Sequence, residues 1–292
     1  MINVAIVGFG NIGKAVYKAI SQSKDIYVSA IVSSKNAIKS VPVVRDIAEL
    51  SDDIQVAILC TPSRSVPDFA AALLARGIRT VDSYDIHTSI VEVRSSLDSI
   101  AKQHGSAAIT AAGWDPGSDS VVRTLMEAMI PKGITYTNFG PGMSMGHTVA
   151  VKAIPGVKEA LSITIPVGTG IHRRMVYVEL NEGASFETVS KMIKEDDYFV
   201  HDETHVTLVE NVDALKDMGH GVHLTRKGVS GTTHNQRVEF NMSINNPALT
   251  AQILVSSARA VMKQAPGCYT MIEIAPIHFL YGDTDDLVRR LV

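Results

Sequence analysis

Three glycines near the start of the chain have the spacing of a phosphate-binding turn. They lie in Gly8-Phe9-Gly10-Asn11-Ile12-Gly13, directly after the apolar run Ile2–Val7. In a G-x-G-x-x-G turn the first glycine permits the tight bend, and the second lets the backbone approach a pyrophosphate. The third lets the following helix pack closely on the strand, and the phosphates bind at the helix N-terminus. Because the amphipathic run Ile12–Ile20 and the apolar run Tyr27–Val32 follow, the pattern predicts a dinucleotide site rather than a bare turn.

The residues after the second apolar run indicate which dinucleotide would bind. A site for NAD has a carboxylate at this position, which accepts a hydrogen bond from the ribose 2′-hydroxyl. Here the residues are Ser33-Ser34-Lys35, with no acid among them. Two hydroxyls and an ammonium suit a 2′-phosphate, which a carboxylate would repel. The sequence therefore favours NADP(H), with a solvated surface charge as the alternative for Lys35.

Two carboxylates follow later apolar runs and could bind a cationic group. Asp85 lies in Val81-Asp82-Ser83-Tyr84-Asp85-Ile86-His87, and Asp115 lies in Gly113-Trp114-Asp115-Pro116-Gly117. Each has a second interpretation as the N-cap of the helix that follows. Capping does not explain why the only tryptophan of the chain precedes Asp115.

Groups suited to carboxylates occur later in the chain. The segment Phe139-Gly140-Pro141-Gly142-Met143-Ser144-Met145-Gly146-His147-Thr148 is a second glycine-rich loop that opens a helix, and its backbone N–H groups suit an anion. An ordinary turn is the alternative. Arg174 offers a guanidinium fork for a carboxylate, or is a solvated edge residue. His220, in a glycine-flanked patch, has no neighbour at metal-ligand spacing.

The sequence predicts that the helices and strands that position these residues form two regions. Strands and helices alternate up to Ala111, which predicts βαβ units, a parallel sheet and ligands beyond the carboxyl ends of the strands. A helix is expected from Pro116 to Ile130, with Asp115 as its N-cap. Beyond it the chain predicts an α+β region on an open mixed or antiparallel sheet. Its expected strands are 157–167, 175–180, 205–210, 220–226 and 237–244, with a helix at 185–195.

The expected fold is thus an α/β Rossmann-type dinucleotide-binding domain with an α+β substrate and oligomerisation domain, and a cleft between them for a small ligand. The predicted boundaries are 1–116 for the first, 117–246 for the second, and 247–292 for a segment that returns to the first. The last segment begins with a long helix at 247–263.

Composition narrows the class of protein. Of 292 residues, 46% are hydrophobic and 20% are charged, as in globular enzymes. A net charge of −3 without a basic stripe argues against nucleic acid as a partner. Cys60 and Cys268 form neither a disulfide framework nor a metal-binding pattern. A strand at the very start leaves no room for a signal peptide, and no apolar run approaches a membrane span, so we expect a cytoplasmic protein without membrane partners.

These residues carry a resemblance to the meso-diaminopimelate dehydrogenase family over essentially the full length of the chain. G-W-D-P-G at 113–117 and G-P-G-x-S-x-G-H at 140–147 are its specific motifs, and further matches are 4–13, 81–87, 153–157 and 272–276. The resemblance implies NADP-dependent, reversible oxidative deamination at the D-centre of meso-2,6-diaminopimelate. The product would be L-2-amino-6-oxopimelate, tetrahydrodipicolinate in cyclised form, on a bacterial route to lysine and cell-wall precursors. It also implies a homo-oligomer, with a dimer favoured.

The resemblance further implies roles for individual residues. Asp85 and Asp115 would bind the ammonium of the reacting D-centre, with Trp114 as the wall, and either could be the catalytic base; we favour Asp115. The carboxylates and the distal L-centre would be held by Thr148, Thr164, Arg174, His220 and Asn246, and the pocket completed by Phe139, Met145 and Gly146. The cofactor contacts would be Gly8, Phe9, Gly10, Asn11, Ile12, Gly13, Ser33, Ser34, Lys35, Cys60, Thr61, Pro62, Ser63, Ser83, Tyr84 and Asp85. No metal is expected.

The chain departs from the family pattern at three places. Met145 stands where many members have Gln, Ser34-Lys35 replaces an Arg pair, and the region around 168–171 is short. These departures favour a less strict pocket that accepts other D-amino acids or 2-oxo acids. A broader D-amino acid dehydrogenase is therefore one alternative. An aspartate- or homoserine-type dehydrogenase would share the glycine fingerprint but lack G-W-D-P-G. A non-catalytic NADP(H) sensor would need no dicarboxylate pocket.

Overall fold

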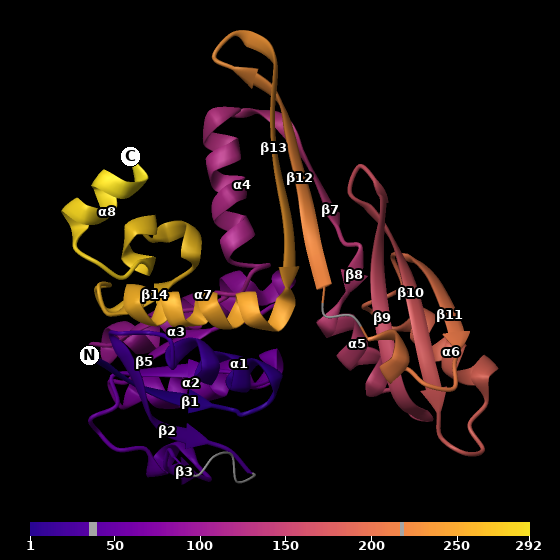
Figure 1. Cartoon of the computed structure of the whole chain (residues 1–292), viewed down its shortest axis with the longest axis horizontal. Coiled ribbons are helices and arrows are strands. Elements are labelled where there is room, and N and C mark those ends of the chain that lie inside the picture. The colour runs from indigo at the N-terminus through magenta and orange to yellow at the C-terminus, as the bar shows by residue number, and fades with distance from the viewer. Residues whose placement is uncertain (35–39, 217–218) are drawn as a thin grey trace. The chain divides into compact units, whose positions relative to one another are not determined.

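The computed structural model describes residues 1–34, 40–216 and 219–292, so Lys35 lies outside the described residues. The chain forms two compact units (Figure 1). The first unit contains residues 1–124 and 247–292, and the second contains residues 125–246. The first unit is therefore built from two separate segments of the chain, while the second is continuous.

The first unit is built on a seven-stranded parallel sheet in the order β14-β6-β5-β4-β1-β2-β3. The strands are β1 (Ile2–Val7), β2 (Ile26–Val32), β3 (Val43–Val44), β4 (Val56–Leu59), β5 (Arg79–Asp82), β6 (Ala107–Ile109) and β14 (Gly267–Tyr269). The order outward from β1 reverses between β2 and β4, as in doubly wound nucleotide-binding folds. The predicted Rossmann-type sheet is confirmed.

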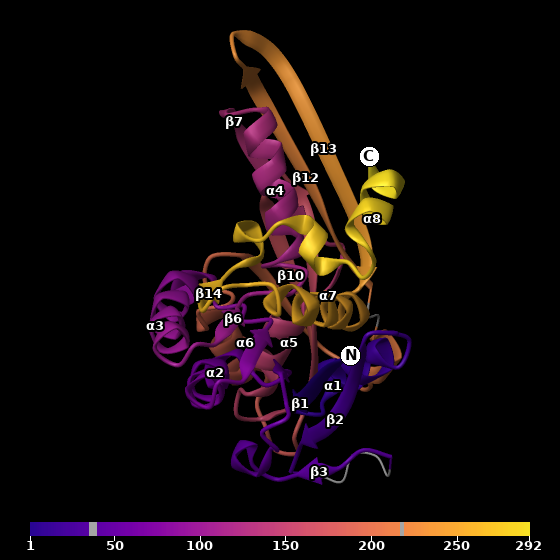
Figure 2. The same cartoon turned by 90° about the vertical axis from the view of Figure 1, so that its left-hand side faces the viewer.

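Helices cover both faces of this sheet, which explains the uninterrupted apolar strands. In β1, Val4 and Ile6 belong to one core cluster, and Ala5 and Val7 belong to another. The first cluster also takes side chains from α1 (Asn11–Ile20) and α7 (Asn246–Val261), and the second from α2 (Val66–Ala75) and α3 (Ile90–Gln103). Successive residues of a strand point to opposite faces, so a strand buried on both sides must be apolar throughout. Figure 2 shows the same helices from a second direction.

The predicted start of the helix after G-W-D-P-G is wrong by two residues, and Asp115 is not its N-cap. Helix α4 spans Ser118–Met129. Before it, the N–H of Gly113 donates to the carbonyl of Pro116 at 2.9 Å, so Asp115 lies inside a closed turn. Gly117 has φ of 144°, and a Cβ there would overlap the backbone of Gly113. The turn therefore requires glycine at its end.

The capping interpretation of Asp85 is also not what the structure shows. The short helical turn that follows is His87–Ser89, and its N-cap position is Ile86. The carboxylate of Asp85 instead accepts a hydrogen bond from the Ser63 hydroxyl at 2.6 Å. Neither Asp85 nor Asp115 caps a helix, so capping does not account for either carboxylate.

The second unit contains two sheets rather than the single sheet that the sequence predicted. A mixed sheet has the order β11-β10-β9-β8, and an antiparallel sheet has the order β13-β12-β7. The strands are β7 (Lys132–Phe139), β8 (Gly142–Met143), β9 (Val157–Gly168), β10 (Ile171–Leu180), β11 (Glu203–Leu208), β12 (Gly219–Ser230) and β13 (Thr233–Asn245). Helices α5 (Met145–Lys152) and α6 (Phe186–Glu195) complete this unit, and α8 (Thr284–Leu291) belongs to the first.

The second unit is predominantly an α+β structure, as predicted, and β12 and β13 form its long hairpin (Figures 1 and 2). In the three described ranges of the chain, no helix is long and apolar enough to cross a membrane. The same ranges hold no group of three or more His, Cys, Asp or Glu side chains that could bind a metal ion.

Candidate active site

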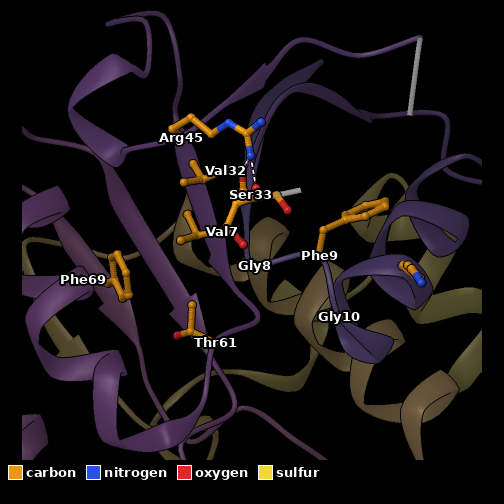
Figure 3. A pocket seen from close by; sticks show the side chains of 11 residues that line it. Val7, Gly8, Phe9, Gly10, Val32, Ser33, Arg45, Thr61 and Phe69 are labelled. Carbon is orange, nitrogen blue, oxygen red and sulfur yellow. Dashed lines mark hydrogen bonds between the residues drawn. The ribbon is translucent and has the colours of Figure 1, made fainter. Parts of the chain in front are cut away.

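A cavity of about 530 Å³ lies at the carboxyl ends of β1 and β2, where the glycine fingerprint begins (Figure 3). The turn between β1 and α1 forms part of its lining, and the residues after β2 form another part. The lining residues are Val7, Gly8, Phe9, Gly10, Lys14, Val32, Ser33, Ser34, Arg45, Thr61 and Phe69. This position beyond the strand ends is where doubly wound sheets bind nucleotides.

The three glycines of the turn have the environments that a dinucleotide site requires. Gly8 has φ of 92°, and a Cβ there would lie 2.7 Å from the carbonyl oxygen of Cys60. A Cβ at Gly13 would overlap the carbonyl oxygen of Gly8. At Gly10, the N-cap of α1, a Cβ would have no atom within 4 Å. The turn is therefore closed on its protein side and open above the helix N-terminus, which fits a bound pyrophosphate.

The predicted cofactor residues divide into two groups by position. Those that line the cavity are Gly8, Phe9, Gly10, Ser33, Ser34 and Thr61. Those outside the lining, among the described residues, are Asn11, Ile12, Gly13, Cys60, Pro62, Ser63, Ser83, Tyr84 and Asp85. The lining residues that sequence reasoning missed are Val7, Lys14, Val32, Arg45 and Phe69. Lys14 directly follows the fingerprint, which was a usable signal, whereas Phe69 lies in the middle of α2.

A buried acid fixes the loops that carry the two candidate carboxylates. Oδ1 of Asp82, at the end of β5, accepts hydrogen bonds from the Tyr84 N–H (2.9 Å), the Thr110 hydroxyl (2.9 Å) and the Ala111 N–H (3.1 Å). Burial raises the pKa of Asp82 to about 6, although these three donors act in the opposite direction. Asp82 therefore ties the loop after β5, which contains Asp85, to the start of the loop that contains Asp115.

Asp115 belongs to a charged cluster in the first unit. Its Oδ1 lies 3.4 Å from Arg123 Nη1, and its Oδ2 lies 4.0 Å from His87 Nε2. Arg123 Nη2 also lies 2.7 Å from Asp119 Oδ2, without hydrogen-bond geometry at that oxygen. The Asp115 side chain is 13% exposed, whereas that of Asp119 is fully buried. Trp114, only 7% exposed, packs in the turn beside Asp115.

The pKa of Asp119 lies well above its ordinary value. Burial raises its pKa to about 8, and the neighbouring Asp115 carboxylate adds to this shift against the opposing charge of Arg123. Two carboxylates in one partly dry site cannot both ionise at low cost, so one keeps a proton. Burial of the Asp119 side chain makes its protonated form the more favourable one. Asp119 was not predicted as a site residue, because nothing in the sequence distinguishes it from a first-turn helix acid.

The raised pKa predicts how stability depends on pH. An acid whose pKa rises from 3.8 in the unfolded chain to about 8 in the fold destabilises the fold progressively as pH rises between these values. Asp82 titrates at about pH 6 or below in both states. The lowered pKa values of His147 and His172 act in the opposite direction and mainly below pH 7, so Asp119 dominates the interval from pH 7 to 8. We expect the unfolding free energy to fall by up to about 1.4 kcal/mol across this interval. Denaturant unfolding at pH 7 and pH 8 measures it.

Asp119→Asn is the variant that identifies the source of this slope. The amide cannot ionise, so the fall between pH 7 and 8 should be lost. Asp68→Asn, at an exposed acid on α2, is the matched control and should keep the slope. An unchanged slope in Asp119→Asn would show that another group causes the fall.

In the second unit, Arg174 and Thr164 meet across neighbouring strands. They are register partners in the antiparallel pair β9–β10, and Arg174 Nη1 donates to the Thr164 hydroxyl. Arg174 Nε donates to Asp202 Oδ2 at 2.6 Å, and both charged side chains are largely buried. Asp202 was not predicted. It lies just before β11, and the parallel pairing of β10 with β11 brings it beside Arg174.

The glycine-rich loop at 140–142 brings His220 towards the same place. A Cβ at Gly140 would overlap the carbonyl of Thr164, and a Cβ at Gly142 would overlap that of Gly219. The loop therefore packs against β9 on one side and the start of β12 on the other, where His220 is 6% exposed. Such close approach of backbones is possible only without side chains. The glycines of this loop are therefore explained by close packing of the backbone against β9 and β12.

Several other predicted substrate residues have definite partners inside the second unit. The Thr148 hydroxyl donates to the carbonyl of Ser144, the N-cap residue of α5, at 2.6 Å. It also accepts a hydrogen bond from the Ser162 N–H at 3.0 Å, so its proton is already used in a hydrogen bond inside the unit. The Phe139 N–H donates to His172 Nε2 at 2.8 Å. Met145 packs on the apolar cluster that contains Leu161.

Next to Met145, Gly146 is half-buried in the first turn of α5, and Asn246 begins α7. His147 was not predicted as a site residue but is held in the same part of the unit. Its Nδ1 lies 2.7 Å from the Ser144 hydroxyl, and its ring packs edge-on against Tyr198 and Phe199. Burial lowers the pKa of His147 to about 4, so its imidazole is neutral at physiological pH.

Comparison with known proteins identifies relatives over the whole chain. Residues 113–246 match the model for the diaminopimelic acid dehydrogenase C-terminal domain, and residues 1–83 match the model for a CoA binding domain. A meso-diaminopimelate D-dehydrogenase of Bacteroides fragilis is 61% identical and covers 100% of this chain and 99% of its own. One from Lysinibacillus sphaericus is 34% identical over 89% of this chain and 88% of its own.

A solved structure gives the same answer. The C. glutamicum DAP dehydrogenase in complex with DAP superposes with a TM-score of 0.92 at 31% identity, covering 100% of this chain and 99% of that chain. An engineered D-amino acid dehydrogenase bound to NADP⁺ superposes with a TM-score of 0.88 at 30% identity, covering 100% and 99%. The sequence motifs, both units of the fold and these full-length similarities agree, and the chain belongs to the meso-diaminopimelate dehydrogenase family.

Proposed function

We propose that this chain catalyses the NADP-dependent, reversible oxidative deamination of meso-2,6-diaminopimelate at its D-centre. The products are L-2-amino-6-oxopimelate, which cyclises to tetrahydrodipicolinate, and ammonia, so the reaction belongs to lysine biosynthesis. The observation that carries this proposal is the 61% identity, across the entire chain, with an enzyme named for the reaction. The open glycine turn supports a dinucleotide, the acids of the first unit suit an ammonium group, and Arg174 of the second unit suits a carboxylate.

We assign the anionic cluster of the first unit to the reacting ammonium. Asp85 and Asp115 are held by the loops that Asp82 joins, and Asp115 Oδ1 lies 3.4 Å from Arg123 Nη1. An ionised carboxylate can accept a hydrogen bond from the ammonium and then remove its proton. We assign that proton transfer to an oxygen of Asp115, with Trp114 as the apolar wall. Burial and the Asp115 carboxylate raise the pKa of Asp119, which disfavours a second negative charge beside Asp115.

We assign the polar cluster of the second unit to the substrate carboxylates. Arg174 supplies a guanidinium, whose fork matches a carboxylate, and Asp202 and Thr164 fix its direction. His220 and Asn246 are the further groups that we place here, with Phe139, Met145, Gly146 and Thr148 shaping the site. The pKa of His147 is lowered to about 4, so its imidazole adds no charge beside Arg174 and Asp202.

The dinucleotide is assigned to the cavity at β1 and β2. The residues that would hold it are the glycine turn, Ser33, Ser34, Thr61 and the other lining residues. When bound, NADP⁺ supplies the acceptor for the hydride that leaves the D-centre. The protein supplies orientation, charge and exclusion of water.

We also propose that the chain forms a homo-oligomer, with a dimer favoured. Three large apolar side chains of the second unit support it, since Leu125, Met129 and Ile134 are each more than half exposed. Light scattering should give about twice the chain mass of 31.4 kDa. A mass equal to that of one chain would contradict the proposal.

The activity is tested by following absorbance at 340 nm with purified protein, NADP⁺ and each diaminopimelate stereoisomer at alkaline pH. We expect reduction with the meso isomer and little with the L,L isomer, which has no D-centre. NAD⁺ and D-alanine are the comparison substrates. Silence with the meso isomer but activity on simple D-amino acids would indicate a broader deaminase. No reduction with any of these compounds would favour a different dehydrogenase or a sensor.

A further inference from the structure

Arg45 lies at the rim of the cavity, at the place where β2 ends. It directly follows β3, whose Val43 and Val44 pair in parallel with Ile31 and Val32 of β2. The carboxyl ends of these strands therefore meet at one edge of the sheet. Arg45 Nη1 donates to the carbonyl of Ser33 at 3.4 Å and to that of Ser34. Figure 3 shows the guanidinium over Ser33 at the cavity.

The backbone of Arg45 is fixed by a capping box. Glu49, at the end of the short helical turn Ile47–Glu49, accepts hydrogen bonds from the N–H groups of Arg45 and Asp46, both at 2.9 Å. Asp46 in turn accepts from the Ala48 N–H at 2.8 Å. Both nearby acids are thereby engaged with backbone donors. Arg45 is therefore the charged residue of this segment that lines the cavity, and the hydrogen bond to Glu49 holds its backbone in place.

The charge of the cavity agrees with this placement. Among the described lining residues there is no Asp or Glu, while Lys14 and Arg45 are cations. A carboxylate after β2 marks a free ribose 2′-hydroxyl, whereas an arginine nearby accommodates a 2′-phosphate. A guanidinium carries five N–H donors, so it can bind backbone carbonyls and a phosphate together. The site is therefore built for an additional phosphate at this end.

We propose that Arg45 binds the 2′-phosphate of the dinucleotide, together with the hydroxyls of Ser33 and Ser34, and so sets the preference for NADP over NAD. This inference rests on the proposed function, since it deepens the assignment of the cofactor cavity. The segment after β2 has Ser34-Lys35 in place of an arginine pair. Arg45, which directly follows β3, would supply a guanidinium in its place. The parallel pairing of β3 with β2 is what brings that residue to the phosphate.

Arg45→Ala tests the role through binding alone, without turnover. We expect the dissociation constant for NADPH, measured by fluorescence titration, to rise about 10- to 100-fold, as the loss of charge-assisted hydrogen bonds implies. Affinity for NADH should stay within about twofold, because NADH has no 2′-phosphate. Arg45→Lys should recover part of the NADPH affinity, since it keeps the charge but not the fork. Arg64→Ala, an exposed residue outside the lining, is the charge-matched control and should change neither value.

The outcomes separate this inference from the proposed reaction. An equal loss of NADPH and NADH affinity in Arg45→Ala would mean that the residue only shapes the loop, and would overturn the inference. So would unchanged affinity for both, or a wild-type chain that binds NADH as tightly as NADPH. A selective loss of NADPH affinity in a chain that fails to deaminate meso-diaminopimelate would instead uphold Arg45 and reject the reaction. Thermal unfolding of each free variant checks that it has folded.

Discussion

Asp115→Asn should bind NADPH as tightly as the wild type and lose at least about 100-fold in turnover with meso-diaminopimelate. The amide has the size of the carboxylate but cannot take a proton from the substrate ammonium, and general-base catalysis contributes a factor of about 10² to 10⁴. The turn that holds residue 115 is closed by Gly113, Pro116 and Gly117, so the backbone should not change. Steady-state kinetics with a separate NADPH titration measure both quantities.

Asp85→Asn is the informative companion, because the residues alone left two candidate bases. Asp85 already accepts a hydrogen bond from Ser63, so its amide variant should raise KM more than it lowers kcat. Full turnover in Asp115→Asn combined with a large loss in Asp85→Asn would transfer the role to Asp85. Asp68→Asn should leave both constants unchanged.

Gly13→Ala should lower the free energy of unfolding by about 3 kcal/mol and abolish NADPH binding. The added methyl group would overlap the carbonyl oxygen of Gly8, and backbone on both sides cannot move away without shifting α1 from β1. Denaturant unfolding in the absence of cofactor gives the stability change directly. Titration with NADPH gives the binding change.

Gly10→Ala is the matched control, since it makes the same chemical change three residues earlier. A Cβ at Gly10 would have no atom within 4 Å, so the stability should stay within about 1 kcal/mol of the wild type. The methyl group would nevertheless stand where the pyrophosphate approaches, so NADPH affinity should fall by at least about 10-fold. Equal stability losses in the two variants would refute the division into a closed side and an open side.

The fold of the first unit could be predicted because its strands are buried on both faces. The apolar runs at β1, β2 and β4 stand out from their surroundings, and the turn between β1 and α1 has a fingerprint with a known physical cause. The second unit was harder because β7 is exposed or half-buried along its length and β8 has only two residues, so neither has a distinctive pattern. A two-sheet arrangement therefore could not be distinguished from one sheet.

In the candidate site, too, the sequence indicated the positions of single residues but not their partners. Strand ends indicated where Asp85, Asp115 and Arg174 would be placed, but their partners depend on pairing between segments far apart in sequence. Arg45 reaches the cavity through β3, and Asp202 reaches Arg174 through β11. Asp115 was assigned as a possible helix cap because Asp-Pro is a common helix start, whereas the turn before α4 depends on the contact between Gly113 and Gly117.

The first unit draws its seventh strand and part of one core layer from residues that follow the second unit in the chain. β14 pairs with β6, and α7 supplies Ala251, Leu254 and Val255 to the cluster that covers β1. During synthesis, domains generally fold in order from the N-terminus. Here the continuous segment 125–246 can complete its sheets before the nucleotide-binding unit has all its strands. We therefore expect newly made chains to acquire cofactor affinity late, after the ribosome has added α7 and β14.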